Sequence, residues 1–528
     1  MSLHKLFLRF SPCVVVFVLS SVSLLAQERT PAPQAGTPAS APPSVSPTLK
    51  LREELIGEVS PDSKVEMARS TENHLAWVEK KGGERIVKLD GKQVGGVYQD
   101  ASFLRFSEDE QHLAFTAKRN SKWVLVLDGQ ERSKEYGRLT APSLSKNGKF
   151  FAVAGCREKR CRLIVNGDEM TPEFDDVSAP RFTSNGEHYG YFAKRDKKWV
   201  LMLDNQEFGP EMNMVISWWM DPDGKRVAVA GLIDKNWTWV VDKTPGPGFD
   251  VIGDIAFSPD YKHFAYGGTD AKWGFSKNKT HGVIVVDGKV AGEYEGRGFG
   301  GSWQGMFGAS TQIAPGLRNL SPDFHGVSDP QYTPDGKLVY AGRRGEDNVV
   351  VMIDGAAGPP FEDIVSPIAI STEGNHVFYV GKRGDSFVEV RDQKAGASFP
   401  GKRAESFVGL LMISNDGAHL AYEIVRGGKQ FMAGNTTRAL RRVVVDGQAG
   451  PEYDALGLRD LNLRAEGKRY HYAVIGAEGT HDRVVFNGLE TKLYDDVFSR
   501  SVEFVDDQTI DFVAQDGQRF IRVTAVME

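Results

Sequence analysis

The chain has 528 residues, which exceeds one ordinary hydrophobic core and indicates either two domains or an array of repeats. Charged residues make up 25% of the chain and the hydrophobic class 41%, a composition typical of a globular protein rather than a disordered one. The formal net charge of −6 argues against a general polyanion binder such as a nucleic-acid-binding protein, although it leaves room for a local basic face.

The first 26 residues have the pattern of a secretory signal peptide. His4, Lys5 and Arg9 form a short basic segment, an apolar run follows over 13–25, and Ala26 offers a cleavage point. The run is short for a membrane span, so we expect cleavage and export to the periplasm or the extracellular space, with an uncleaved anchor as the alternative. Residues 27–48 are rich in Pro, Ala, Ser and Thr and predict an extended linker. No later segment is apolar enough to predict a stable membrane span.

Two turn markers recur along the rest of the chain. The first resembles Ser-Pro-Asp-Gly, and its third residue falls at Glu72, Asp109, Asn147, Asn185, Asp223, Asp260, Asp335, Glu373, Asp416, Glu466 and Asp507. The second is an Asp or Asn after an apolar run, usually followed by Gly, and it falls at Asp90, Asp128, Asn166, Asp204, Asp242, Asp287, Asp354, Asp392, Asp446 and Asn487. From Asp90 to Asp242 each step of the second marker is 38 residues. A fixed internal period of this length indicates a repeat architecture.

Each repeat predicts four short strands. The segment 199–203 is apolar at every position, which is typical of a strand that is buried on both faces. Asp-Gly and Asn-Gly favour the two-residue hairpin turn with positive φ. An aromatic residue closes most repeats and indicates the fourth strand; this position holds Tyr98, Tyr136, Phe174, Phe249, Tyr294, Phe361, Phe399, Tyr453 and Tyr494, with Met212 in the same slot. Trp123, Trp199 and Trp237 share another register, which favours blade-to-blade packing over sugar binding. The pattern predicts an all-β fold, a β-propeller with about eleven four-stranded blade repeats.

Three segments resemble a known family. FSPDYKHFAY at 257–266, YTPDGKLVYAG at 332–342 and VVVDGQAGPEYDAL at 443–456 are similar to the TolB-like, WD-repeat-like propeller repeats of bacterial exported proteins. The resemblance covers roughly residues 50–528 and implies a propeller, whereas such repeats serve many roles. The translocation protein TolB has an α/β domain before its propeller, and here a Pro-rich linker stands in that place, so the role of TolB is not transferred.

The number of repeats bears on domain organisation. Eleven repeats exceed the four to eight blades of a usual ring. We therefore expect two tandem or interlocked propellers, one over 49–296 with about six blades and one over 328–528 with about five, separated by an irregular Gly-rich insertion at 297–327. The last repeat lacks a fourth strand, which residues 51–59 are able to supply. In that case the two rings interlock through the termini, or one unusually large ring forms.

Cys156 and Cys161 are the two cysteines left after removal of the leader. Their spacing fits a short hairpin and export permits oxidation, so we expect a disulfide, with two free thiols as the alternative. We predict no metal site and no cofactor.

The sequence contains no G-x-S-x-G, H-E-x-x-H or P-loop motif. One histidine position recurs three residues after the first turn marker, at His112, His188, His263, His376 and His419. Residues at one repeat position lie in different blades and are therefore far from one another around a ring. We thus expect these histidines to be structural and not to converge on one site. The alternative to a non-catalytic protein is a propeller hydrolase, lyase or lactonase with a site in a central channel.

Insertions concentrate on one predicted face. If the four strands of a blade are A to D, the B–C loops and D–A connections lie together, and they lengthen at 267–282, 297–327 and 424–441. The B–C tips are also basic, and the D–A connections place acidic residues on the same face. The positive and negative charges either neutralise each other locally or leave a cationic face. Candidate binding residues there are Trp273, Trp303, Met306, Arg426, Lys429, Arg438, Arg441 and Arg442. We predict an exported scaffold that binds a protein or an anionic polysaccharide, but no nucleic acid, through this face. A tethered sensor ectodomain is a further alternative if the leader is retained.

Overall fold

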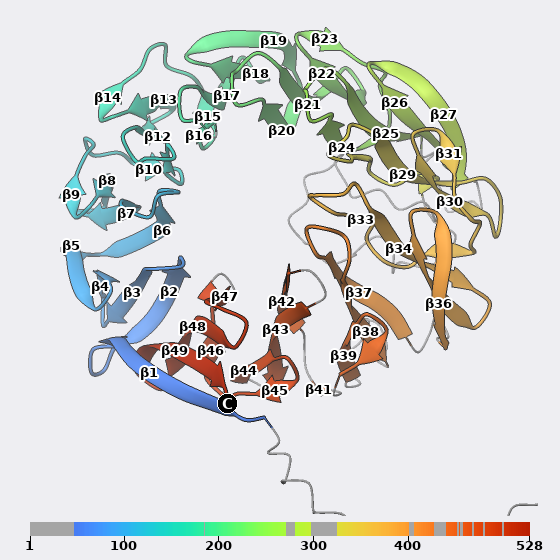
Figure 1. Ribbon diagram of the computed structural model, residues 1–528. Helices are drawn as coiled ribbons and strands as arrows, with labels where there is room; N and C mark the ends of the chain where they lie inside the picture. The colour runs from blue at the N-terminus through green and yellow to red at the C-terminus, as the bar shows by residue number, and fades with distance from the viewer. Residues whose placement is uncertain are drawn as a thin grey trace, which may run out of the picture. The chain divides into compact units, whose positions relative to one another are not determined.

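The computed structural model describes residues 47–183, 185–270, 280–296, 325–400, 406–426, 440–450, 453–454, 458–466, 469–478, 481–498 and 501–528. Within these residues eleven antiparallel sheets stand in one ring (Figure 1). Each sheet is one blade with four strand positions, A to D, from the inside of the ring to the outside. The predicted all-β propeller is therefore confirmed.

The bounds of the strands follow the repeat. The innermost A strands are β2 (Lys64–Ser70), β6 (Asp100–Phe106), β10 (Arg138–Leu139) with β11 (Ser143–Leu144), β15 (Asp176–Val177) with β16 (Arg181–Phe182), β20 (Met214–Met220), β24 (Val251–Phe257), β28 (Gln331–Tyr332), β32 (Asp363–Ile364) with β33 (Ala369–Ile370), β37 (Ser406–Ile413), β42 (Leu458–Glu466), and β46 (Asp496–Val497) with β47 (Glu503–Phe504). The B strands are β3 (Leu75–Lys81), β7 (Leu113–Arg119), β12 (Phe151–Arg157), β17 (Tyr189–Arg195), β21 (Val227–Ile233), β25 (Phe264–Asp270), β29 (Leu338–Arg343), β34 (Val377–Arg383), β38 (Leu420–Arg426), β43 (Arg469–Glu478) and β48 (Thr509–Asp516).

The C strands are β4 (Glu84–Leu89), β8 (Lys122–Leu127), β13 (Arg160–Val165), β18 (Lys198–Leu203), β22 (Asn236–Val241), β26 (Thr280–Val286), β30 (Val349–Ile353), β35 (Ser386–Arg391), β39 (Leu440–Val445), β44 (His481–Phe486) and β49 (Arg519–Met527). The D strands are β5 (Lys92–Tyr98), β9 (Gln130–Glu131), β14 (Asp168–Glu169), β19 (Gln206–Met212), β23 (Thr244–Pro245), β27 (Lys289–Gly296), β31 (Ala356–Ala357), β36 (Lys394–Pro400), β40 (Gln448–Ala449) with β41 (Tyr453–Asp454), β45 (Leu489–Glu490) and β1 (Leu49–Glu58).

The C–D turns have the conformation that their sequence predicts. The Asp or Asn of the second marker has a φ between 47° and 51° in Asp90, Asp128, Asn166, Asp204, Asp242, Asp287, Asp354, Asp392, Asp446 and Asn487. The next residue is usually a Gly with positive φ, as the two-residue hairpin turn requires. Asn205, Lys243 and Gln393 occupy that second position with φ of 64°, 71° and 64°, where a side chain is unfavourable.

Neighbouring blades lock together through a large residue and a glycine. The residue that closes one blade is buried and packs onto a Gly of the next B strand. A Cβ atom added at Gly268 would lie 2.4 Å from the ring of Phe249, and one at Gly381 would lie 2.4 Å from Phe361. The same contact joins Tyr136 to Gly155, Met212 to Gly231 and Tyr294 to Gly342. The closing aromatic position therefore serves inter-blade packing, and the glycine opposite it has no room for a side chain.

The N-terminal strand completes the last blade. β1 pairs with β49 in antiparallel register from Leu49 opposite Met527 to Glu58 opposite Arg519, so Leu49–Glu58 supplies the missing fourth strand that the sequence assigned to 51–59. A buried carboxylate, that of Glu79, lies where the chain leaves β1 and enters blade 1. The Glu79 side chain is 1% exposed and accepts hydrogen bonds from Trp77 Nε1 at 2.8 Å and from the Ser60 amide at 3.2 Å. Lys88 Nζ lies 2.8 Å from the same carboxylate, so the buried charge is paired.

Two rings or one large ring were both compatible with the repeats, and we favoured two. The structure has one ring, because blades 6 and 7 pack directly on each other. Tyr294 of blade 6 and Tyr340 of blade 7 share a core cluster, and their hydroxyl groups lie 2.8 Å apart. The insertion at 297–327 therefore does not divide the core of the described residues, although its residues 297–324 lie outside them.

Candidate binding face

The A–B and C–D turns of the blades form one face of the ring, which we call the turn face. The B–C tips and D–A connections form the other, which we call the loop face. Local chemistry differs between the two, and it decides which one is a candidate for binding.

One side-chain clamp recurs on the turn face. A His that precedes the B strand faces the Asp of the C–D turn in its own blade, with Nδ1 to Oδ2 distances of 2.6–2.8 Å. The pairs are His74–Asp90, His112–Asp128, His188–Asp204, His263–Asp287, His376–Asp392 and His419–Asp446. The other oxygen of the Asp accepts a hydrogen bond from the first amide of the B strand. Asp392, for example, accepts one from the Val377 amide at 2.9 Å. In blade 5 Arg226 replaces the His and pairs with Asp242 at 2.7 Å.

The clamps also join neighbouring blades. A Cβ atom added at Gly417, in the A–B turn of blade 9, would lie 2.4 Å from the ring of His376 in blade 8. The same contact places His112 on Gly148 and His188 on Gly224. His112, His188 and His376 thus bind within their own blades and pack on the next, which agrees with the structural interpretation of the histidine row.

Acids of the A–B turns are held in the ionised form. Ser258 Oγ donates to Asp260 Oδ1 at 2.7 Å, and this hydrogen bond is the largest cause of a pKa well below the usual range for that carboxyl. Hydrogen bonds from Ser107 and Ser414 likewise lower the pKa of Asp109 and Asp416. Blades 3 and 4 use Asn147 and Asn185, which accept the same hydrogen bond without charge.

The loop face also carries ion pairs, and one of them recurs: Arg119–Glu131, Arg157–Glu169 and Arg195–Glu207 share one repeat position in blades 2 to 4. Arg119 reaches Glu131 at 2.8 Å, Arg160 reaches Asp175 at 2.8 Å, and Arg195 reaches Glu207 at 2.9 Å. Lys118 and Lys194 instead lie over the rings of Trp123 and Trp199. These side chains are largely exposed, so each pair contributes little stability and opens readily. Within the described residues, much of the basic charge of the tips is therefore balanced locally.

Most candidate residues of the long loops lie outside the described residues. These are Trp273, Trp303, Met306, Lys429 and Arg438. Arg426 and Arg441 are placed as backbone, on β38 opposite Leu440 and on β39 opposite Val425. Arg442 lies on β39 opposite Ile424 and is half-buried. These residues stay a prediction.

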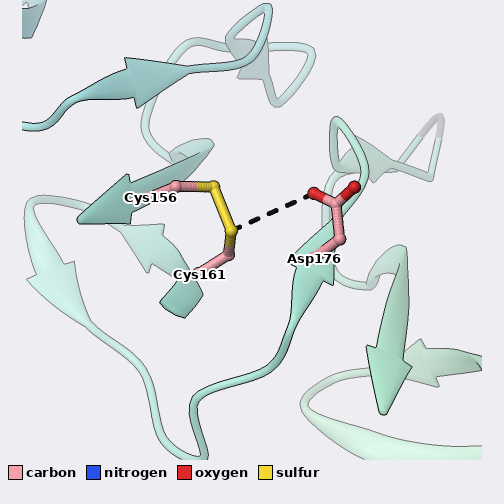
Figure 2. Close-up of side chains that lie close together, drawn as sticks. All are labelled: Cys156, Cys161 and Asp176. Carbon is pink, nitrogen blue, oxygen red and sulfur yellow. Dashed lines mark hydrogen bonds between the residues drawn. A yellow bond between two sulfur atoms is a disulfide. The ribbon is translucent and has the colours of Figure 1, made fainter. Parts of the chain in front are cut away.

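A disulfide lies near the tip of blade 3. Cys156 on β12 and Cys161 on β13 are directly opposite, their Cα atoms are 4.0 Å apart, and their sulfur atoms are bonded. Asp176 Oδ1 lies 4.0 Å from Cys161 Sγ (Figure 2). Arg138 pairs with Asp176 and donates to Cys156 Sγ at 3.1 Å. Among the described residues, Cys156, Cys161 and Asp176 are the group whose side chains lie close enough together to bind a metal ion. A metal ion binds cysteine as the thiolate, and these two sulfur atoms are bonded to each other, so the geometry is that of a covalent cross-link.

A further polar feature lies on the inner wall, where sequence analysis identified no site. Arg69, Arg105 and Arg181 occupy one position of the A strands, opposite Ala76, Ala114 and Gly190. We call these three residues the inner arginine row. All three are exposed, and Arg181 lies over the ring of Trp218 at 5.0 Å. Partial desolvation there lowers the pKa of Arg181.

A fixed offset would have revealed two of the three arginines, but not Arg69, which stands five residues before His74. Arg105 and Arg181 each stand seven residues before the clamp His of their blades, and Trp219 stands seven before Arg226. Aligning the repeats on the clamp therefore exposes the position, whereas a search for linear motifs does not.

Comparisons with known proteins assign this chain neither a family nor a function. No protein-family model matches the chain, and no curated protein matches it significantly. Among solved structures it is similar to TolB from Acinetobacter baumannii, with a TM-score of 0.24 and 14% identity over 46% of this chain and 62% of that one. It is also similar to a prolyl endopeptidase, with a TM-score of 0.29 and 15% identity over 65% and 54%. A third similar structure is the Dos1 propeller, with a TM-score of 0.25 and 11% identity over 71% and 91%.

The chain spans less than two thirds of the first two of these structures. The propeller assignment rests on the eleven sheets themselves. No helix in the described part of the chain is long and apolar enough to cross a membrane.

Proposed function

We propose that this chain is an exported, non-catalytic propeller that captures a protein or an acidic glycan through its loop face. The supporting observation is the difference between the two faces. The turn face has short turns and one clamp in most blades, while the long insertions at 267–282, 297–327 and 424–441 fall on the loop face beside exposed ion pairs such as Arg195–Glu207. Loops that vary in length on a rigid repeated scaffold are where recognition usually resides.

The charges of the loop face suit capture of a polar partner. The Arg195 side chain is 46% exposed and its partner Glu207 is 48% exposed, so the pair is weak and both groups remain accessible. A partner with complementary charges is able to replace such pairs at little cost in free energy.

Shortening one long B–C loop tests the proposal. In blade 2 the two residues Asn120 and Ser121 join the paired Arg119 and Lys122. Arg426 and Leu440 are paired in the same way across the loop of blade 9. Replacing 427–439 with Asn-Ser should therefore leave the sheet intact, as checked by circular dichroism, and should abolish capture of partners from an extract of the source cells, quantified by mass spectrometry.

A matched control alters the other face. Lys225→Gln and Lys262→Gln change exposed turn-face lysines and should leave capture unchanged. Retained capture by the shortened chain, or loss of capture in the control, would contradict the proposal. Turnover of hydrolase or lyase substrates that survives loop shortening would instead favour an enzyme with its site inside the ring.

A further inference from the structure

The inner wall of the ring is chemically one-sided. Blades 1, 2 and 4 place Arg69, Arg105 and Arg181 at one A-strand position, and blades 3 and 5 place Ser143 and Trp219 there. In blades 6 to 11 the described side chains at that position are Ala256, Gln331, Ala369, Met412 and Glu503. The three guanidinium groups are thus confined to five consecutive blades.

Acidic residues mark the wall beyond those blades. Asp254 and Asp329 stand two positions before the row position in blades 6 and 7, and the Asp254 amide donates to Asp329 Oδ1 at 3.0 Å. Burial raises the pKa of Asp254. The arginines of blades 1, 2 and 4 therefore favour an anionic ligand, whereas the acidic residues of blades 6 and 7 do not.

A cavity of about 340 Å³ opens between blades 1 and 2, and Arg69 and Arg105 both line it. Its volume lies at the lower end of the range for ligand pockets. Glu72, Glu108 and Glu110 also line it, from the A–B turns. Glu110 accepts the amides of Glu72 and Asn73 at 3.2 Å, and Glu108 pairs with Lys146 at 3.1 Å, so two of these acids are already occupied. Arg69, Ser70 and Arg105 are the polar groups on the A-strand side of the cavity, and the two arginines are its cations.

Two aromatic side chains stand at or near the row position, in blades 2 and 5. Phe103, two residues before Arg105, is 42% exposed and has a φ of 60°, a conformation that is rare for an aromatic residue and that marks local strain. Trp219 is half-buried and stacks on Phe257, with ring centroids 3.9 Å apart and planes at 12°. Flat apolar surfaces next to guanidinium groups suit sugar rings that carry carboxylates, because Arg binds carboxylate in a bidentate manner.

The A strands are poorly suited to an extended peptide. Their register is interrupted by bulges between Val65 and Met67, Ser102 and Arg105, and Val215 and Ser217, while blades 3 and 4 split the A strand in two. Bulges and breaks prevent a peptide from pairing along a strand edge. Recognition on this wall therefore depends on side chains.

We propose that the inner arginine row, with Phe103 and Trp219, binds an acidic polysaccharide whose uronate carboxylates pair with Arg69, Arg105 and Arg181 along the wall of blades 1–5. This inference rests on the proposed binding role but uses a surface other than the loop face. The ligand is thus held by side chains at one repeat position in blades 1, 2 and 4.

Calorimetric titration with alginate oligosaccharides tests the proposal. Wild-type protein should bind them, and raising the salt concentration from about 0.05 M to about 0.5 M should weaken binding because the contacts are ionic. Each of Arg69→Gln, Arg105→Gln and Arg181→Gln should weaken binding by about 5- to 10-fold. Arg→Lys variants keep the charge and should lose less. Thermal unfolding of each variant shows whether binding is lost because the fold is lost. This control matters most for Arg181→Gln, since Arg181 packs on Trp218.

Controls and outcomes are distinct from those of the loop face. The double variant Arg119→Gln/Arg195→Gln removes two loop-face arginines and should bind alginate as the wild type does. Neutral dextran added as a competitor should not displace alginate from the wild type. The proposal is overturned if the triple Gln variant binds alginate as the wild type does, if the wild type binds none, or if it binds poly-glutamate peptide but not alginate. Capture through the loop face should survive in the triple variant, so failure of either proposal is recognisable by itself.

Discussion

The turn face and the loop face are built on the same strands but use side chains in opposite ways. On the turn face a single contact, the clamp between His376 and Asp392 and its counterparts, joins strand to turn and blade to blade. On the loop face the outermost contacts are exposed ion pairs, which repeat in blades 2 to 4 as Arg119–Glu131, Arg157–Glu169 and Arg195–Glu207, while the closing residues just beneath, such as Phe361, are buried. The comparison teaches that the buried and clamped layers hold the blades together, and that the loop face differs from them in its exposure and in the length of its loops.

The largest effect is expected from breaking the layer beneath the loop face. Phe361 is 1% exposed and fills the space above Gly381. Phe361→Ala should lower the free energy of unfolding by about 3–5 kcal/mol, measured by urea denaturation, because it leaves a cavity between two blades. Val97→Ala, at a side chain that is 50% exposed, serves as the control and should change it little. A loss below about 1 kcal/mol for Phe361→Ala would show that blades 7 and 8 do not depend on this contact.

Breaking a clamp should have a smaller effect. Asp392→Ala removes hydrogen bonds to His376 and to the Val377 amide, at an expected cost of about 1–2 kcal/mol in the free energy of unfolding. The control is Asp354→Ala in blade 7, because Asp354 has a φ of 48° and Asp392 a φ of 47°. Blade 7 has Lys337 in place of the clamp His, and Lys337 pairs with Asp335. The backbone cost of the substitution is then equal in both variants. Equal losses would mean that the clamp itself contributes nothing.

Acid should weaken the turn face selectively. Hydrogen bonds lower the pKa of Asp109, Asp260 and Asp416 below the usual value of 3.8. A carboxyl with a lowered pKa in the folded state contributes stability above pH 3.8, and that contribution is lost as the pH falls through the folded-state value. Thermal unfolding between pH 5 and pH 2 should therefore show a falling midpoint.

Asn substitutions sharpen that test. Asn147 and Asn185 already make the same hydrogen bond without a charge. Replacing Asp109, Asp260 and Asp416 with Asn should flatten the dependence of the midpoint on pH below 4. An unchanged slope would place the acid sensitivity in other carboxylates.

The smallest effect is expected at the loop-face tips. Arg195→Gln removes the exposed pairs with Glu207 and Glu211 and should change the free energy of unfolding by no more than about 0.5 kcal/mol. Urea denaturation of this variant beside Asp392→Ala compares the two faces directly. A loss at Arg195 that matches the loss at Asp392 would remove the distinction between them.

Much of the fold and little of the site was predictable. Four strands per repeat, the positive φ of residues such as Asp90, and the buried closing aromatics follow from local patterns, and all appear in the structure. The number of rings did not follow, because it depends on whether Tyr294 and Tyr340 meet across an insertion. The inner arginine row was missed because Arg69, Arg105 and Arg181 are separated by dozens of residues and form no motif.

The sequence by itself determined the blade. Asp-Gly chemistry selects the turn, and apolar runs select strands that are buried on both faces, since both effects act within a few residues. Only the tertiary structure decided how the blades close and what faces the interior. β1 completes the sheet of β48 and β49, Glu79 is buried at the seam with Lys88, and each glycine meets its aromatic from the blade before. These contacts join residues from different repeats, and their geometry exists only once the ring has formed.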